Sequence, residues 1–206
     1  AHVPDCPDSF YSLLGLSSMS VWNKSMNVLV QLAVSMRSHQ KGGILLVVPY
    51  GTEEWRQSIR HPMRYAVGPA YSELAELMLR KDEMDPLWQD EIKRAIDALA
   101  GFTAVDGATI ISNRYELYGF GAKITRKLGS IPVEKLIMTE PIIGGEARID
   151  QPALSGGTRH LSAAQFVHDQ RDAMALVASQ DGRFTIFSWS NCENMVQANR
   201  IDSLLL

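Results

Sequence analysis

The order of apolar segments in this chain predicts an α/β domain in which helices flank a mixed central β-sheet. Three observations carry this prediction. Residues 44–48 are all apolar, which is typical of a central strand that is buried on both faces. Apolar residues recur with helical spacing over residues 18–40 and 85–100. Residues 108–124 form two apolar runs around a short polar turn, as in a β-hairpin.

The N-terminal residues 1–41 predict a helical preface, and residues 42–206 predict the compact main domain. In residues 18–40 polar side chains separate an apolar stripe, and such a stripe favours packing on a core over a dimer interface. Gly42 and Gly43 then end this helix and begin the first strand.

The next segment, residues 49–71, predicts a long connection with one short helix, because Pro62 and Pro69 prevent a longer one. Ser72 and Asp85 are N-cap residues for two further helices. For the second of these, a buried face is predicted that consists of Leu87, Ile92, Ala95, Ile96 and Leu99. The connection also carries a basic cluster, for which a solvated loop face is favoured over a phosphate site. The cluster consists of Arg56, Arg60, His61 and Arg64.

The second half of the chain predicts mainly strands. Residues 108–112 and 115–124 form a hairpin in which Gly119 and Gly121 flank Phe120. Two explanations of these glycines stay open: an adenine base approaches the backbone with Phe120 beside it, or the glycines relieve crowding around a core Phe120. Further strands are predicted at residues 133–139, 142–148, 173–179 and 183–189.

Composition is ordinary for one globular domain of 206 residues, with 46% hydrophobic and 21% charged residues. The net charge of −3 argues against broad nucleic-acid binding. Cys6 and Cys192 favour a reduced, cytoplasmic chain over a bridge between the termini. No apolar run has the length of a membrane span.

A phosphate-binding pattern stands at Gly156-Gly157-Thr158-Arg159-His160, immediately before an amphipathic segment. Glycines let a ligand approach the backbone, and the start of a helix adds partial positive charge. Thr158 offers a hydroxyl, Arg159 a forked cation and His160 a further donor. Asp106, in Asp106-Gly107-Ala108, adds the carboxylate that a divalent metal or a ribose hydroxyl requires.

These two motifs, in this order, resemble the nucleotide-binding domain of the diadenylate cyclases over residues 42–189. The resemblance implies a diadenylate-cyclase-like fold, ATP as ligand with Mg²⁺ or Mn²⁺, and cyclic di-AMP formed between two facing subunits. Two departures stand out. Leu161 occupies the position of a second arginine in the catalytic members, and Gln180 follows Ser179 where they tend to have an acid. Both departures remove charge that phosphoryl transfer uses.

The departures favour a sensor domain that binds an adenine nucleotide or cyclic dinucleotide and signals to a fused or associated effector, or to a second subunit. The alternative is an active cyclase in which Asp106 is catalytic and holds the metal, with Arg64 replacing the lost cation. A silent scaffold that dimerises is the third hypothesis. The predicted nucleotide-binding residues are Asp106, Gly107, Ala108, Gly119, Phe120, Gly121, Gly157, Thr158, Arg159, His160 and Ser179.

Overall fold

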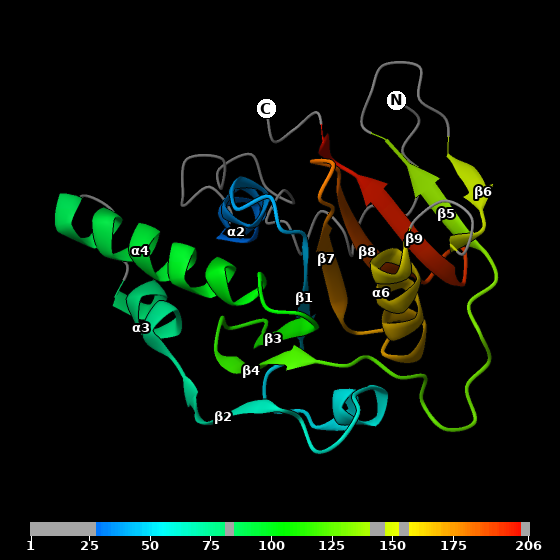
Figure 1. The fold of residues 1–206 in the computed structure, drawn as a ribbon, viewed down its shortest axis with the longest axis horizontal. Helices are drawn as coiled ribbons and strands as arrows, with labels where there is room; N and C mark the ends of the chain where they lie inside the picture. Colours follow the sequence, from blue (N-terminus) through cyan, green and yellow to red (C-terminus); the bar gives the residue numbers. More distant parts are fainter. Residues whose placement is uncertain (1–27, 81–84, 141–146, 153–156, 203–206) are drawn as a thin grey trace.

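The computed structural model describes residues 28–80, 85–140, 147–152 and 157–202 (Figure 1). Within these residues the strands are β1 (Gly43–Val48), β2 (Tyr65–Tyr71), β3 (Ala108–Ser112), β4 (Leu117–Ala122), β5 (Leu136–Thr139), β6 (Arg148–Asp150), β7 (Met174–Ala178), β8 (Phe184–Ser190) and β9 (Met195–Arg200). The helices are α2 (Val28–Ser38), η2 (Glu54–Ser58), α3 (Glu73–Arg80), α4 (Pro86–Phe102) and α6 (Thr158–Asp169).

All these strands join in one sheet with the order β2-β4-β3-β1-β7-β8-β9-β5-β6. β1 lies inside the sheet, parallel to β3 on one side and antiparallel to β7 on the other. In this register Ile44 lies opposite Ala108 of β3 and Val177 of β7. The predicted α/β class with a mixed sheet flanked by helices is therefore confirmed.

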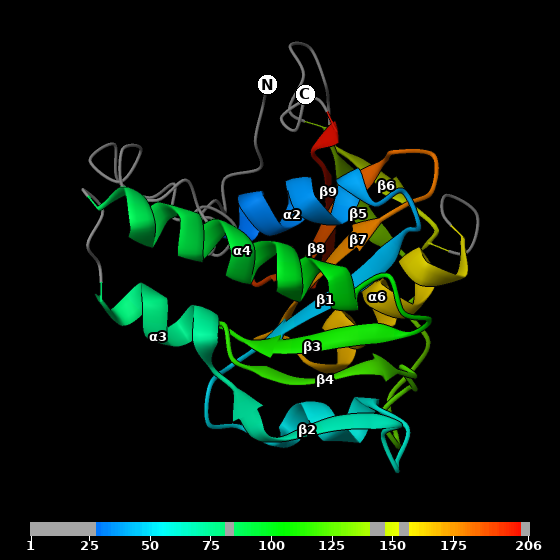
Figure 2. The ribbon, with the colours of Figure 1, turned by 60° about the vertical axis from the view of Figure 1, so that its left-hand side comes forward.

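The two faces of the sheet are covered by different helices, as Figures 1 and 2 show. On β1, Leu45 and Val47 belong to the hydrophobic cluster that includes α2, α3 and α4. Ile44 and Leu46, which alternate with them, belong to the cluster that includes α6 and Trp55 of η2. Because successive side chains of a strand point to opposite faces, a strand between two helical layers is apolar at every position.

Helix α4 begins where the sequence predicts, but its buried face lacks the predicted Leu87 and includes Trp88 and Ala100. Asp85 is its N-cap, and the carboxylate accepts a hydrogen bond of 2.9 Å from the backbone N–H of Leu87. Leu87 itself is 70% exposed, so its predicted place in the core is wrong. Trp88 is buried instead, and its indole N–H donates to the carbonyl oxygen of Leu77 in α3.

Two strands are absent from the prediction. β2 lies at one edge of the sheet, pairs only with β4, and contains Gly68 and Pro69, which are unfavourable in strands. β9 lies inside the sheet, but the polar residues Gln197 and Asn199 hide its strand character. Residues 65–71, which were predicted as part of a long connection, therefore form a strand. A further strand also follows the last predicted one.

Several predictions fall partly on residues outside the described part of the chain. The N-terminal helix is described only from Val28 onward, and most of the strand predicted at residues 142–148 is not described. Of the described residues in that segment, only Arg148 belongs to a strand, namely β6 (Arg148–Asp150), which pairs antiparallel with β5. The boundary between residues 41 and 42 stays a prediction, although α2 packs against α4 and the sheet.

Cys192 lies in the exposed turn between β8 and β9 and is disulfide-bonded. The preference for two reduced cysteines is therefore wrong at this residue, and Cys6 lies outside the described residues. In the part of the chain that the structure describes, no helix has the length and apolar character that crossing a bilayer requires.

Candidate functional site

The two predicted motifs meet where the strands β1 and β3 begin. These strands run parallel, so Asp106 and Gly107, just before β3, lie at the same end of the strands as Gly42, just before β1. β4 returns antiparallel, which brings Ala122 opposite Ala108 and places Lys123 at this end as well. The first turn of α6 also reaches this end, because Thr158 and Arg159 line a cavity together with Asp106.

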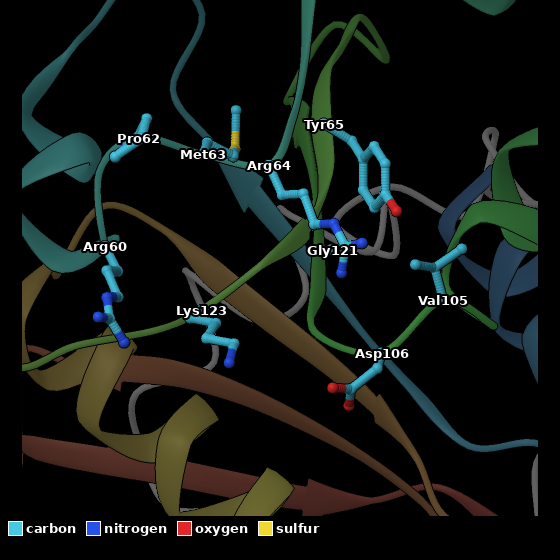
Figure 3. Close-up of a pocket in the computed structure, with 9 residues that line it drawn as sticks. All are labelled: Arg60, Pro62, Met63, Arg64, Tyr65, Val105, Asp106, Gly121 and Lys123. Carbon is cyan, nitrogen blue, oxygen red and sulfur yellow. The ribbon is translucent and has the colours of Figure 1, made fainter.

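Two cavities of about 440 Å³ and about 230 Å³ share Asp106 and Lys123. We call them together the Asp106 groove. The larger cavity is lined by Arg60, Pro62, Met63, Arg64, Tyr65, Val105, Asp106, Gly121 and Lys123 (Figure 3). The smaller is lined by Ile44, Asp106, Gly107, Ala108, Ala122, Lys123, Ile124, Thr158, Arg159 and Ser162. Cavities of this size hold small ligands.

The charge of the groove is strongly asymmetric. Four cationic side chains line it, namely Arg60, Arg64, Lys123 and Arg159, against the single carboxylate of Asp106. Among the described residues none of these four cations forms an ion pair, and Asp106 forms none either. Cations that converge without carboxylate partners repel one another, and a bound anion relieves that repulsion.

A third cavity nearby shows the opposite arrangement. It measures about 110 Å³ and its lining includes Arg148, Arg183 and Arg200. Arg183 pairs with Asp181 at 3.3 Å, and Arg200 with Glu140 and with Asp202 at 3.2 Å. Arg148 lies 3.8 Å from Asp150. Because carboxylates already neutralise these arginines, this cavity attracts an anion less than the groove does.

The predicted site residues divide between these cavities. Asp106, Gly107, Ala108, Thr158 and Arg159 line the smaller cavity of the groove, and Gly121 lines the larger one. Gly157, His160 and Ser179 line the third cavity instead. The structure thus brings Asp106, Gly107 and Ala108 together with Thr158 and Arg159 in one cavity. It places Gly157, His160 and Ser179 at a different cavity.

Gly107 and Gly121 allow the backbone segments before β3 and at the end of β4 to touch. A Cβ on Gly107 would lie 2.6 Å from the carbonyl carbon of Gly121, and the φ angle of Gly107 is +110°. Gly121 has a φ of +62°, and a Cβ there would lie 2.8 Å from the ring of Tyr65. Close contact between protein segments therefore accounts for both glycines.

Phe120 does not line any of the three cavities. Its ring stacks on Tyr65 with centroids 4.9 Å apart, and it also contacts Phe102 at 4.8 Å. Gly119 is buried, and a Cβ on it would lie 2.4 Å from the side chain of Met63. Of the two explanations for these residues, the structure favours packing, and Tyr65 takes the position on the cavity that Phe120 was expected to hold.

The start of α6 carries backbone donors as well as polar side chains. Gly157 is the N-cap and forms no side-chain cap. The first N–H groups of a helix lack intrahelical acceptors, and the helix dipole makes this end partially positive. Arg159 reaches back over Gly42, where a Cβ would lie 3.2 Å from its Nη1 atom. The absence of a side chain at Gly42 therefore makes room for the guanidinium.

His160 points away from the groove into the third cavity. Its Nε2 lies 3.3 Å from the hydroxyl of Thr185, and its ring meets Phe187 edge-on at 5.8 Å. Burial is the largest influence on its pKa, which is lowered from the ordinary value of 6.5. A neutral imidazole at neutral pH adds no charge for a phosphate, so the cations of the groove matter more.

This lowered pKa predicts a pH-dependent stability. Between the folded pKa of His160 and 6.5 the unfolded chain binds more protons, so stability falls as pH drops through 6.5 and levels off below the folded pKa. We expect His160→Gln to reduce the loss of unfolding free energy between about pH 7.5 and about pH 5.5. Urea unfolding at both pH values checks this. An unchanged loss in the variant contradicts it, and His39, whose pKa burial also lowers, accounts for part of the remaining slope.

The basic cluster of the connection is split by the fold. Arg56 pairs with Glu53 and its guanidinium lies over the ring of Trp55 at 4.6 Å, so it is engaged outside the groove. Arg60 and Arg64 line the groove. The backbone N–H of Arg60 donates to the carbonyl oxygen of Lys123 at 2.8 Å, which holds the backbones of Arg60 and Lys123 beside each other.

Lys123 and Tyr65 were missing from the predicted site. Lys123 lies near the end of the strand predicted at residues 115–124, so its place near Asp106 could be deduced from the hairpin register. Tyr65 lies on β2, which the sequence did not predict, and its pairing with Phe120 brings it to the cavity. Nothing in the local sequence around Tyr65 marks this position.

A divalent metal has limited support from the protein in this groove. Asp106 is the only carboxylate among its described lining residues, and those residues contain no cluster of three metal-ligating side chains. Mg²⁺ is commonly held by one or two carboxylates together with substrate phosphates. Among the described lining residues, only Asp106 offers a carboxylate with which the protein would hold a metal that arrives with a nucleotide.

The two departures from the catalytic motif lie outside the groove lining. Leu161 is half-buried and packs against the hydrophobic cluster of the α6 face, where an arginine would lose solvation. Gln180 is exposed, and its side-chain amide donates to the carbonyl oxygen of Lys41 at 3.4 Å. Neither residue supplies charge to the groove.

Comparison with known proteins leaves the family open. No family model matches the sequence, and no curated protein matches it either. A solved structure of a hypothetical membrane spanning protein from Bacillus cereus is similar, with 13% identity and a TM-score of 0.46. The match covers 87% of this chain and 65% of that chain, so this chain spans less than two thirds of that protein.

A cysteine double mutant of DacA from Staphylococcus aureus is also similar, with 13% identity and a TM-score of 0.39. That match covers 86% of this chain and 87% of the DacA chain. At these identities and TM-scores neither structure establishes the family to which this chain belongs.

Proposed function

We propose that the Asp106 groove binds an adenine nucleotide or a cyclic dinucleotide and that the chain acts as a sensor of this ligand. The observation that carries the proposal is the convergence of Arg60, Arg64, Lys123 and Arg159, none with an ion pair among the described residues, around one cavity system. Phosphates are among the anions that arginine forks and helix N-termini bind.

The smaller cavity provides the phosphate contacts in this proposal. Arg159 and Lys123 supply charge, Thr158 supplies a hydroxyl, and the start of α6 supplies backbone N–H groups. Asp106 accepts a hydrogen bond from a sugar hydroxyl or holds a metal that enters with the nucleotide. The larger cavity then receives the rest of the ligand, with Arg60 and Arg64 at its margin.

A sensor must also report its ligand. Helix α6 extends from the groove across one face of the sheet, and its residues Phe166 and Val167 are buried in the core. A ligand that orders the start of α6 therefore acts on an element with extensive packing, and an effector or a second subunit would respond to that change.

Titration calorimetry with ATP, ADP and cyclic di-AMP tests the proposal, each with and without Mg²⁺. We expect saturable binding of at least one of them at one site per chain, weakened by salt because charge dominates the contact. The silent-scaffold hypothesis predicts instead that no nucleotide gives binding heat or shifts the melting temperature. That outcome would remove the sensor proposal.

The alternative function is a diadenylate cyclase. It is favoured by the position of Arg64, which lines the groove with Asp106 and could replace the cation missing at Leu161. In this reaction a ribose 3′-oxygen forms a bond to an α-phosphorus of ATP, the bond to diphosphate breaks, and the hydroxyl proton passes to water. Asp106 would hold the metal and orient the hydroxyl, and the groove cations would offset charge on the phosphoryl oxygens.

Incubation with labelled ATP and Mg²⁺ or Mn²⁺, followed by chromatography, separates the two functions. The sensor proposal predicts unchanged ATP. A cyclic dinucleotide that forms in the wild-type protein and disappears in Asp106→Asn establishes the cyclase instead. Because asparagine keeps the shape of aspartate, nucleotide binding should largely persist in this variant, and calorimetry checks that it does.

A further inference from the structure

Tyr65 is the one aromatic side chain that lines the larger cavity among the described residues. It lies at the start of β2, opposite Phe120 of β4, and its side chain is partly exposed. Figure 3 shows the ring at the cavity margin, beside Arg64 and above Gly121. An exposed aromatic ring at the wall of a cationic cavity has the two properties that nucleotide sites combine, a π-face and charge for phosphate.

The ring of Tyr65 is held in place from behind. Phe120 stacks on it with an angle of 11° between the planes, and Phe102 of α4 contacts Phe120 in turn. Gly121 leaves space for the edge of the ring, because any Cβ there would lie 2.8 Å from it. A row of three aromatic rings therefore fixes one face of Tyr65, which leaves the opposite face for other contacts.

The guanidinium of Arg64 is the group found over the ring, 5.2 Å from its centroid. Phe120 stacks on the ring, and Arg64 lies within cation–π distance of the same ring. A guanidinium over an exposed ring is held weakly, whereas a charge-assisted hydrogen bond to phosphate is stronger. Arg64 therefore gains by leaving the ring when a phosphate enters the groove.

We propose that the base of a bound nucleotide stacks on Tyr65 in place of Arg64, while Arg64 turns to the phosphates. This inference rests on the proposed function and names the residue that distinguishes a nucleotide from other phosphorylated ligands. Stacking on an aromatic ring strengthens binding for any base, so Tyr65 selects for a base without selecting strongly among bases.

The test compares ATP with inorganic tripolyphosphate, which has the phosphates without base or sugar. Calorimetry measures both ligands on the wild-type protein, on Tyr65→Phe, which keeps the aromatic face, and on Tyr65→Leu, which removes it. We expect ATP to bind more tightly than tripolyphosphate in the wild type and in Tyr65→Phe. In Tyr65→Leu the affinity for ATP should fall roughly 5- to 150-fold while that for tripolyphosphate stays the same.

Each other outcome has a distinct meaning. Equal binding of both ligands in the wild type overturns the stacking role and leaves the phosphate site intact. A preference for ATP that survives in Tyr65→Leu, or an equal loss of both ligands in that variant, also overturns it. Absence of binding by either ligand overturns the proposed function together with this inference. Thermal unfolding of both variants confirms that they are folded before the affinities are compared.

Discussion

Replacement of Arg159 by alanine is expected to weaken nucleotide binding about 10- to 150-fold, which corresponds to about 1.5–3 kcal/mol for a hydrogen bond to a charged group. The guanidinium lines the smaller cavity of the groove, and Gly42 makes room for it. It has no ion pair among the described residues, so its full charge is available to a ligand. Calorimetry with the nucleotide that binds the wild-type protein measures the effect.

Arg183→Ala is the matched control for this experiment. Arg183 is also an exposed arginine beside a cavity, but Asp181 pairs with it at 3.3 Å and it lies outside the groove. Surface pairs of this kind contribute little, so stability and nucleotide affinity should both stay close to the wild type. Equal affinities of the Arg159 variant and the wild type would remove Arg159 from the site.

Replacement of Gly107 by alanine is expected to destabilise the fold by about 2–5 kcal/mol. Two penalties add: a φ of +110° is strained for any residue with a Cβ, and the added atom meets rigid backbone of Gly121 and Ala122 at 2.6 and 2.8 Å. For a domain of this size the melting temperature should fall by about 4–20 °C. Urea unfolding and a thermal scan measure the two quantities.

Gly101→Ala provides the control, because Gly101 lies in α4 with an ordinary φ and nothing within 4 Å of a Cβ. Alanine there should stabilise the protein by about 0.5–1 kcal/mol through helix propensity. A variant at Gly107 that is as stable as the wild type would mean that the segment before β3 and the end of β4 are not in contact. The geometry of the groove would then differ from the one described.

The elements that could be predicted from sequence are those whose pattern is local. β1 is apolar at each residue from Ile44 to Val48 because helices cover both of its faces, and α4 begins at a proline behind a capping Asp85. The meeting of the Asp106 and Thr158 motifs was also predictable, although from a family resemblance rather than from spacing. The structure places them on one cavity without reference to any family.

The rest depends on contacts between distant segments, which no local pattern encodes. β2 is mostly exposed and contains Gly68 and Pro69, so only its pairing with β4 makes it a strand. Tyr65 reaches the groove through that pairing. The orientation of His160 away from Asp106 likewise depends on the rotation of α6 against β8, which the motif does not determine.

A crystal structure with the bound nucleotide tests the central claim most directly, since that claim concerns where the phosphates lie. We predict phosphate oxygens within hydrogen-bonding distance of Arg159 and Lys123, with Asp106 beside the sugar or a metal. Phosphates bound instead in the third cavity, against Arg183, His160 and Ser179, would contradict the account.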